Sequence, residues 1–188
     1  MTNFQGRHGT TGLQVLDGAL TGSAADGSTF TARLPFEAQY AGLPDAAGFA
    51  AAVAPPGKWG VLLVRKGGFA VARLEREKIT ESKVGQRHVQ GRTKAGGQSQ
   101  QRFARRRDNQ ARQAYEAAAE HAVRILGRAK LPVVTGGDHA AVDEVLADPR
   151  LRLVRVVGPW LAVPDPRRDV LDHAVADACS ALVDVVNA

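Results

Sequence analysis

The sequence predicts a mixed α/β fold, in which a sheet is packed against helices. Two apolar, β-branched runs, WGVLLVR (59–65) and FAVARLE (69–75), are separated by Lys-Gly-Gly, which is typical of a β-hairpin. Small and apolar residues then recur at helical spacing from Ala111 to Ile125, and Gly127 can end that helix. After this helix the apolar pattern alternates between short strand-like runs and helical stretches, which favours a mixed sheet.

The remaining elements complete an order of βββαβαβα. A third strand is predicted at KITESKV (78–84), two more at LPVVTG (131–136) and LRLVRVV (151–157), a helix between these at 138–148, and a last helix within 167–186, after Pro164 and Pro166. We expect helices on both faces of this sheet. The order resembles the ribonuclease-H-like architecture.

Residues 1–57 are predicted to form a small N-terminal extension, partly flexible at its start. They are rich in Gly, Ala, Ser and Thr, with one strand expected at STFTARLPF (28–36) and a short helix near 45–54. The PPGK stretch (55–58) marks the boundary. Residues 58–188 are predicted to form the main domain.

Composition excludes several classes of protein. No apolar run approaches the roughly 18 to 20 residues of a membrane helix, and the N-terminus lacks the basic-then-apolar order of a signal peptide. The single cysteine, Cys179, excludes an internal disulfide and a CxxC metal site, and we expect a buried thiol. The sequence therefore predicts a cytoplasmic protein without a metal or other cofactor.

Positive charge is concentrated in one segment. The chain carries a net charge of +6, but residues 83–112 hold nine Lys or Arg and one acid, whereas the rest holds 16 bases and 18 acids. A solvated helix face usually places acids four residues from its bases, and here they are missing. The segment therefore indicates binding to a polyanion, with RNA as the expected partner and neither DNA nor a membrane.

A Gly-Gly-Gln tripeptide lies within this basic segment, between the third strand and the long helix. Gly96 and Gly97 permit backbone angles that other residues avoid and leave the tip without side chains. Gln98 offers one amide acceptor and two donors, and its backbone N–H can point at a developing negative charge. It is not a general base. A catalytic role would therefore consist of positioning water and stabilising an oxyanion.

Basic residues surround the tripeptide on both sides. At helical spacing, Arg102, Arg105, Arg106, Asn109 and Arg112 share one face, which we call the arginine stripe. The residues expected to contact RNA are Arg92, Lys94, Arg102, Arg105, Arg106, Arg107 and Arg112.

The stretch Gly96-Gly97-Gln98-Ser99, followed by Arg102-Phe103-Ala104-Arg105 and Arg107, resembles the GGQSxxRFARxR stretch of archaeal and eukaryotic class-one translation termination factors. The resemblance extends less specifically over residues 58–186. Such factors also have a codon-reading domain and a domain that binds a translational GTPase, for which this chain has no room. The chain is therefore more similar to the Vms-like release factor family, in its compact actinobacterial and chloroflexi branch.

This resemblance implies peptidyl-tRNA hydrolysis in the peptidyl transferase centre of the large ribosomal subunit. Gln98 would orient water or stabilise the tetrahedral intermediate, Gly96 and Gly97 would shape the loop, and the arginine stripe would contact ribosomal RNA or the tRNA acceptor stem. The implied role is release of nascent chains from stalled or obstructed large subunits, independently of a stop codon.

Two other functions stay open. One is a noncatalytic ribosome- or RNA-binding module. The other is a nuclease, which the ribonuclease-H-like order suggests, but the first strand WGVLLVR lacks the carboxylate that would hold a divalent metal ion. Three further residues have plainer expected roles: Asp138 as the N-cap of a helix, His88 as a surface residue, and Phe103 as an anchor of the loop.

Overall fold

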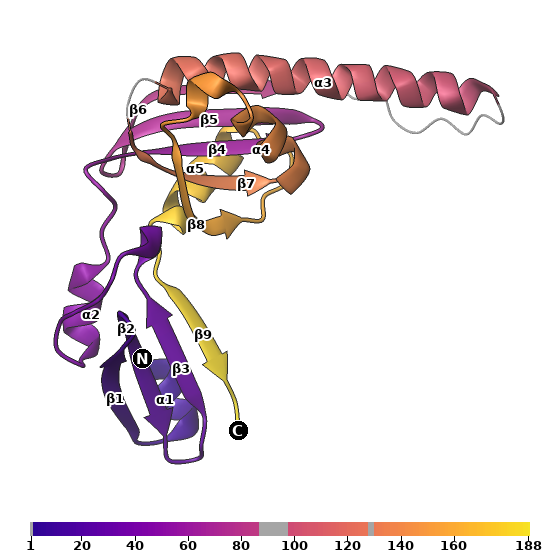
Figure 1. Cartoon of the computed structure of the whole chain (residues 1–188). Coiled ribbons are helices and arrows are strands. Elements are labelled where there is room, and N and C mark those ends of the chain that lie inside the picture. The colour runs from indigo at the N-terminus through magenta and orange to yellow at the C-terminus, as the bar shows by residue number, and fades with distance from the viewer. Residues whose placement is uncertain (1, 87–97, 128–129) are drawn as a thin grey trace. The chain divides into compact units, whose positions relative to one another are not determined.

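The computed structural model describes residues 2–86, 98–127 and 130–188, and for residue 2 and residues 98–111 it describes the backbone alone. The chain divides into two compact units, Met1–Pro55 together with Ala178–Ala188, and Pro56–Asp177. The mixed α/β class is confirmed, with two sheets and five α-helices in the described residues (Figure 1). The likeness to the ribonuclease-H-like architecture stays a prediction.

The second unit contains a five-stranded sheet of order β6-β5-β4-β7-β8. Its elements are β4 (Lys58–Arg65), β5 (Gly68–Glu75), β6 (Lys78–Gln86), α3 (Gln98–Leu126), β7 (Pro132–Gly137), α4 (His139–Leu146), a 3-10 turn (Pro149–Leu151), β8 (Arg155–Leu161) and α5 (Arg168–Ala178). The strands β4, β5 and β6 are antiparallel to one another, whereas β4, β7 and β8 run parallel. The predicted hairpin between β4 and β5 is confirmed.

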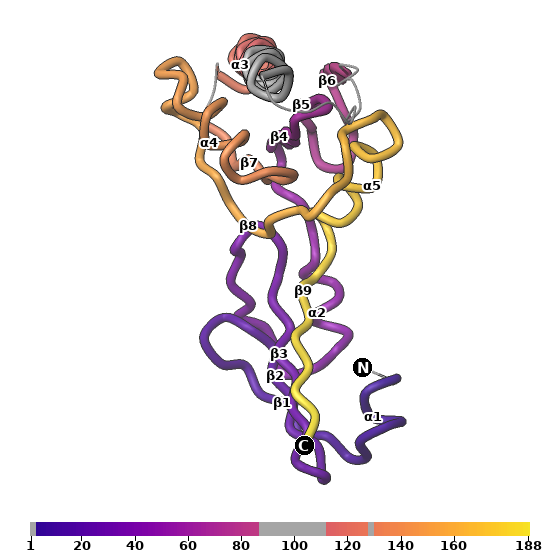
Figure 2. The backbone as a smooth tube through the Cα atoms, turned by 90° about the vertical axis from the view of Figure 1, so that its right-hand side faces the viewer, coloured from indigo at the N-terminus to yellow at the C-terminus, as the bar shows by residue number. Residues whose placement is uncertain are grey.

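Helices cover both faces of this sheet, as expected. Every residue of β4 from Trp59 to Val64 is buried, although successive side chains point to opposite faces. Leu62 and Val64 pack in one core cluster with α3 and α4, while α5 lies on the opposite face (Figure 2). The sheet thus provides the surface on which α3, the helix that follows the Gly-Gly-Gln tripeptide, packs.

The strand predicted at 151–157 is displaced along the chain. Asp148 caps a 3-10 turn over Pro149–Leu151, and the strand β8 begins only at Arg155 and continues through Gly158 and Pro159. The sequence analysis ended this strand at Val157. Proline removes a hydrogen-bond donor, but β8 is at the edge of the sheet and its register to β7 shifts between Val157 and Leu161, so Pro159 is tolerated there.

The first unit is more ordered than its composition predicts. It contains a four-stranded antiparallel sheet of order β1-β2-β3-β9 and a core that includes Leu20, Phe30 and Phe49. Its elements are α1 (Thr2–His8), β1 (Thr11–Leu16), β2 (Ala19–Ala24), β3 (Thr29–Arg33), a 3-10 turn (Pro35–Glu37), α2 (Ala46–Ala52) and β9 (Leu182–Val186). Of these, the sequence analysis predicts only β3 and α2.

The strand β9 occupies the end of the range in which the last helix was predicted, and it joins the first unit. The helix α5 ends at Ala178, and Leu182–Val186 pairs antiparallel with β3, with Leu182 opposite Arg33. The Arg33 guanidinium also donates to the Asp184 carboxylate at 2.7 Å. The first sheet is therefore built from segments nearly 150 residues apart in the sequence.

Candidate functional site

The Gly-Gly-Gln tripeptide lies at the junction between β6 and α3. β6 ends at Gln86 and α3 begins at Gln98, so Gly96, Gly97, Arg92, Lys94 and His88 lie outside the described residues. Gln98 is the first residue of α3.

The N-terminus of α3 provides backbone donors at Gln98. The first N–H groups of a helix have no acceptor within the helix, and the aligned peptide dipoles give this end a partial positive charge. The first turn of α3 contains no acidic residue to offset that charge. A negatively charged atom next to Gln98 would therefore meet a favourable field.

The backbone of α3 supports the predicted arginine stripe. Positions 105 and 106 lie three and four residues after 102, position 109 lies four and three residues after these, and 112 lies three residues after 109, all on a continuous helix. The side chains of Arg102, Phe103, Arg105, Arg106 and Arg107 lie outside the described part. Position 107 is in line with the buried residues Ala114 and Ala118, so it belongs to a different side of the helix from the stripe.

The second half of α3 is held firmly on the sheet. Its buried side chains begin at Ala114 and end at Leu126, in the same cluster as residues of β4 and β5. His121 stacks on Phe69 of β5 with ring centroids 5.5 Å apart, and Arg124 pairs with Glu81 of β6 at 2.9 Å. Burial and the neighbouring cations Lys83 and Arg124 lower the pKa of His121. By helix geometry the part of α3 before Ala114 is about 24 Å long. The contacts of the second half therefore hold one end of this part in place, and Gln98 is at its other end.

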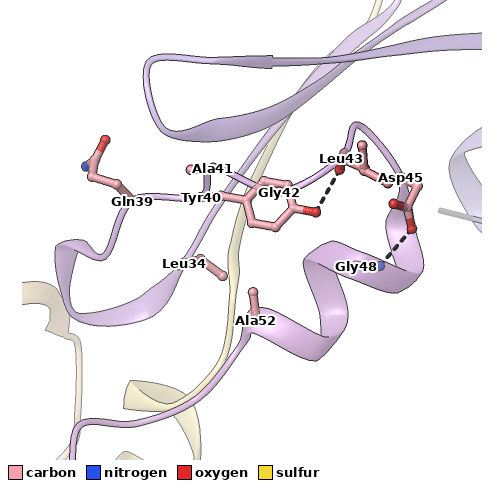
Figure 3. A pocket seen from close by; sticks show the side chains of 9 residues that line it. All are labelled: Leu34, Gln39, Tyr40, Ala41, Gly42, Leu43, Asp45, Gly48 and Ala52. Atoms are coloured by element: carbon pink, nitrogen blue, oxygen red, sulfur yellow. Dashed lines mark hydrogen bonds between the residues drawn. The ribbon is translucent and has the colours of Figure 1, made fainter.

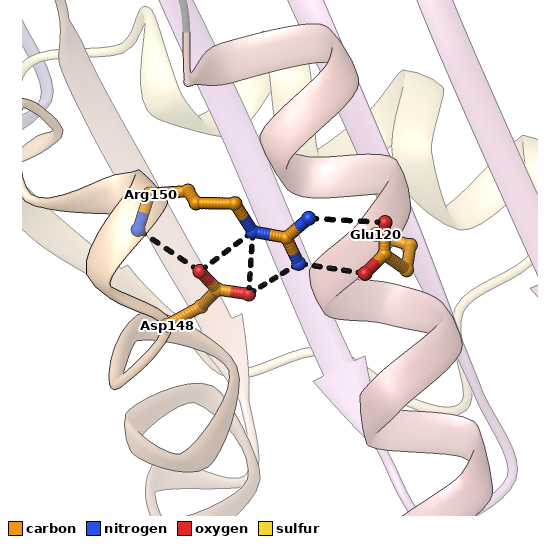
Figure 4. A network of polar contacts seen from close by, with 3 residues as sticks. All are labelled: Glu120, Asp148 and Arg150. Carbon is orange, nitrogen blue, oxygen red and sulfur yellow. Dashed lines mark hydrogen bonds and ion pairs between the residues drawn. The ribbon is translucent and has the colours of Figure 1, made fainter.

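A polar network ties α3 to the 3-10 turn after α4. The Arg150 guanidinium donates to the Glu120 carboxylate at 2.6 Å and to the Asp148 carboxylate at 2.7 Å (Figure 4). Asp148 also accepts from the backbone N–H of Arg150 at 2.9 Å. These bonds hold the pKa of Asp148 at about 2, below its ordinary value of 3.8. The network therefore links Glu120 of α3 to the 3-10 turn Pro149–Leu151.

Replacing Arg150 with alanine is expected to raise the pKa of Asp148 toward 3.8, since its strongest hydrogen-bond donor is lost. A carboxyl whose pKa is depressed in the folded state stabilises it above the unfolded value, and this contribution is lost as the pH falls through about 2. The unfolding free energy of the wild type should therefore fall more steeply between pH 3.8 and 2 than that of the variant. An NMR titration of the Asp148 carboxyl measures the shift, and Arg152→Ala is the matched control. An unchanged pKa in Arg150→Ala would contradict the network.

The chain leaves the sheet for the tripeptide at the carboxyl edge of the parallel strands. Val64 of β4 lies opposite Gly137 at the end of β7, and the β4–β5 hairpin brings Gly68 opposite Gln86, the last residue of β6. We call this region the carboxyl edge. Tyr115 of α3 is buried, and this burial, followed by the charges of Asp138 and Glu144, raises its pKa.

Asp138 has its expected role. It is the N-cap of α4, and its carboxylate accepts from the backbone N–H of Ala140 at 3.1 Å. The next residue, His139, lies flat on Trp160 of β8, with ring centroids 3.5 Å apart and an angle of 11° between the rings. The sequence analysis missed this pair because the two residues are far apart in the sequence and belong to no motif.

The first unit contains a hollow of about 440 Å³ between the segment 39–45 and α2 (Figure 3). The Tyr40 hydroxyl donates to the Leu43 carbonyl at 2.7 Å, and the Asp45 carboxylate accepts from the Gly48 N–H at 2.7 Å. Both polar groups therefore stabilise their own turn. The described side chains nowhere bring together three groups able to hold a metal ion. Cys179, expected to be buried, is half-buried.

A comparison with protein families identifies the relatives of the chain. The family model described as Actinobacteria/chloroflexi VLRF1 release factor matches residues 57–184, which is more than half of the chain. The chain belongs to this release factor family. The match covers nearly all of the second unit and extends into β9. No curated protein matches the chain.

Membership in a release factor family points to translation termination or ribosome rescue, and hence to interaction with the ribosome. The suspected resemblance to the actinobacterial and chloroflexi branch is confirmed. None of the helices in the described part of the chain combines the length and the apolar character of a membrane span.

Proposed function

We propose that this protein hydrolyses the ester bond of peptidyl-tRNA on stalled or obstructed large ribosomal subunits, without requiring a stop codon. The observation that carries the proposal is a Gly-Gly-Gln tripeptide whose glutamine is the first residue of α3, in a member of a release factor family. The catalytic residues would be Gln98, Gly96 and Gly97, on a domain that begins near residue 58.

The proposed chemistry needs no ionisable side chain in the loop. Water attacks the ester carbonyl, the carbonyl oxygen becomes an oxyanion, and the bond to the tRNA 3′ oxygen then breaks to give a peptide carboxylate and a tRNA hydroxyl. The Gln98 amide would orient the water, and the backbone N–H at the N-terminus of α3 would stabilise the oxyanion. Gly96 and Gly97 would allow the loop to approach the ester closely.

The basic residues would hold this loop in place by binding RNA phosphates. Arg102, Arg105, Arg106 and Arg112 share one stripe of α3, and the described Arg112 side chain is exposed. Arg92, Lys94 and Arg107 would add contacts to ribosomal RNA or tRNA around the tripeptide.

Changing Arg102, Arg105 and Arg106 together to glutamine is expected to weaken binding to large subunits and to reduce its dependence on salt. Each lost phosphate contact removes about 0.7 to 0.9 from the slope of log K against log salt, so three contacts remove about 2 to 3. The measurement is equilibrium binding to purified large subunits over a range of salt concentrations. A variant with Arg152, Arg155 and Arg167 changed to glutamine has the same net charge and should keep the wild-type slope. If both variants behave alike, the arginine stripe is only a solvated helix face.

Codon independence is the part of the proposal that separates rescue from termination. The described residues of the second unit form one sheet with its helices, and the first unit is a small sheet with two short helices. We expect peptide release on isolated large subunits that carry peptidyl-tRNA, and stop and sense codons on whole ribosomes should make no difference.

A single-turnover assay tests the function. Purified protein is added to peptidyl-tRNA complexes on large subunits, and free peptide and intact deacylated tRNA are measured. Activity that needs a whole ribosome with a stop codon would contradict rescue. Tight binding without release would identify a noncatalytic ribosome-binding module, and cleaved tRNA would identify a nuclease.

A further inference from the structure

An aromatic pair outside the Gly-Gly-Gln segment lies at the carboxyl edge. Trp160 is half-buried and packs against the main core cluster, which fixes its indole in place. His139 is exposed and lies on this indole with ring centroids 3.5 Å apart and an interplanar angle of 11°. One face of the imidazole is therefore covered by tryptophan, and the residue's exposure leaves the other face to solvent.

The strand register brings this pair close to the point at which the chain leaves for the catalytic loop. His139 follows Gly137, which lies opposite Val64 at the end of β4, and Leu161, the neighbour of Trp160, lies opposite Gly136. Through the hairpin, Gln86 at the end of β6 belongs to the same edge. The pair and the start of the catalytic segment are thus held by one sheet.

One exposed cation lies at the same edge, and two of the neighbouring carboxylates are engaged. Lys66, in the β4–β5 turn, is exposed. The Asp138 carboxylate caps α4, and Asp165 lies 3.6 Å from the Arg65 guanidinium. The edge therefore combines an exposed ring with a cation that suits a phosphate group, although Asp143 and Glu144 on α4 are acids that would oppose RNA binding.

We propose that the His139–Trp160 pair is a stacking site for an unpaired RNA base, with Lys66 next to the adjoining phosphate. Unpaired bases stack on aromatic side chains whatever their sequence, because every base has a π-face. The expectation of RNA rests on the proposed function. The site adds a second RNA contact, on the sheet edge, to that of the arginine stripe.

Tryptophan fluorescence provides a direct test with the full chain. The chain has two tryptophans, and Trp59 is fully buried with its indole N–H bonded to the Arg76 carbonyl. Quenching by an added short oligoadenylate should therefore report on Trp160. We expect saturable quenching in the wild type, and its loss in Trp160→Phe.

The His139→Ala variant tests the role of the imidazole. Loss of one stacked base should weaken oligoadenylate binding by about 5- to 100-fold, and His139→Tyr, which keeps a ring, should restore most of it. The control is His173→Ala, which removes an exposed histidine on α5. Circular dichroism and thermal unfolding verify that each variant is folded.

The outcomes separate this proposal from the proposed function. No quenching, or equal affinity of His139→Ala and wild type, would overturn the stacking site even if peptide release is normal. If His139→Ala loses RNA affinity while the wild type releases no peptide, the stacking site stands and the hydrolase function fails.

Discussion

Replacing Gln98 with alanine is expected to lower the rate of peptide release by about 10- to 1,000-fold, as for loss of one oxyanion or water-positioning group. The backbone N–H groups at the start of α3 remain in this variant, so some activity should persist. Binding to large subunits should be unchanged, because the arginine stripe is untouched. The measurement is single-turnover release at saturating protein, together with the dissociation constant for the large subunit.

The matched control for this prediction is Gln101→Ala, which changes the same residue type one helical turn later. It should release peptide at the wild-type rate. Wild-type release by Gln98→Ala would refute the catalytic assignment of Gln98. A parallel loss of binding would instead mean that Gln98 acts in docking.

Replacing Gly137 with alanine is expected to destabilise the second unit by about 2 to 5 kcal/mol. Gly137 has φ of +105°, which residues with a side chain rarely adopt, and an added Cβ would collide with the carbonyl oxygen of Val64. That oxygen accepts the N–H of Asp138 at 2.8 Å, so the turn cannot relax without losing a bond between β7 and β4. Such a loss is a large fraction of the stability of a typical domain.

Urea unfolding followed by the fluorescence of buried Trp59 measures this effect within the second unit. The control is Gly57→Ala, because nothing lies within 4 Å of an added Cβ there and its φ is not positive. Its unfolding free energy should stay within about 0.5 kcal/mol of the wild type. If both variants unfold at the wild-type urea concentration, the strain at Gly137 is not present in solution.

The sequence is sufficient for the strands and helices of the second unit where periodicity is strong. The hairpin of β4 and β5 and the helix through Ala118 are confirmed, because a buried strand and an amphipathic helix have distinct apolar patterns. The start of β8 was misplaced, since Asp148 and Pro149 begin a 3-10 turn that includes Leu151, the first residue of the apolar run. Edge position, which makes Pro159 acceptable within a strand, is a property of the whole sheet and is not visible locally.

In the first unit, one strand pairing could have been predicted from the sequence and another could not. Asp17 and Gly18 both have positive φ and form the tight turn between β1 and β2, and an Asp-Gly pair between alternating residues is a hairpin signal that the composition obscured. The pairing of β3 with β9 could not be predicted in this way. Leu182–Val186 contains three β-branched valines and could have been expected as a strand, but its pairing with β3 is a long-range contact that no local pattern encodes.

The candidate site also contains residues that the sequence identifies and residues that only the fold brings together. Gly96, Gly97 and Gln98 can be recognised because they form a contiguous motif, and their roles stay predictions. The pair of His139 and Trp160 depends on the parallel register of β7 and β8, so it emerges only from the fold.

The pairing of β9 with β3 also sets an order of events during synthesis. Pro56–Asp177 is a continuous segment, so it can fold as soon as it has left the ribosome. The first sheet is incomplete until Leu182–Val186 has been made, because its edge beside β3 stays open until then. Closing so long a loop costs entropy that the finished sheet offsets, and an already folded second unit shortens the effective distance between its ends. The first sheet is therefore completed only after the second unit has been synthesised.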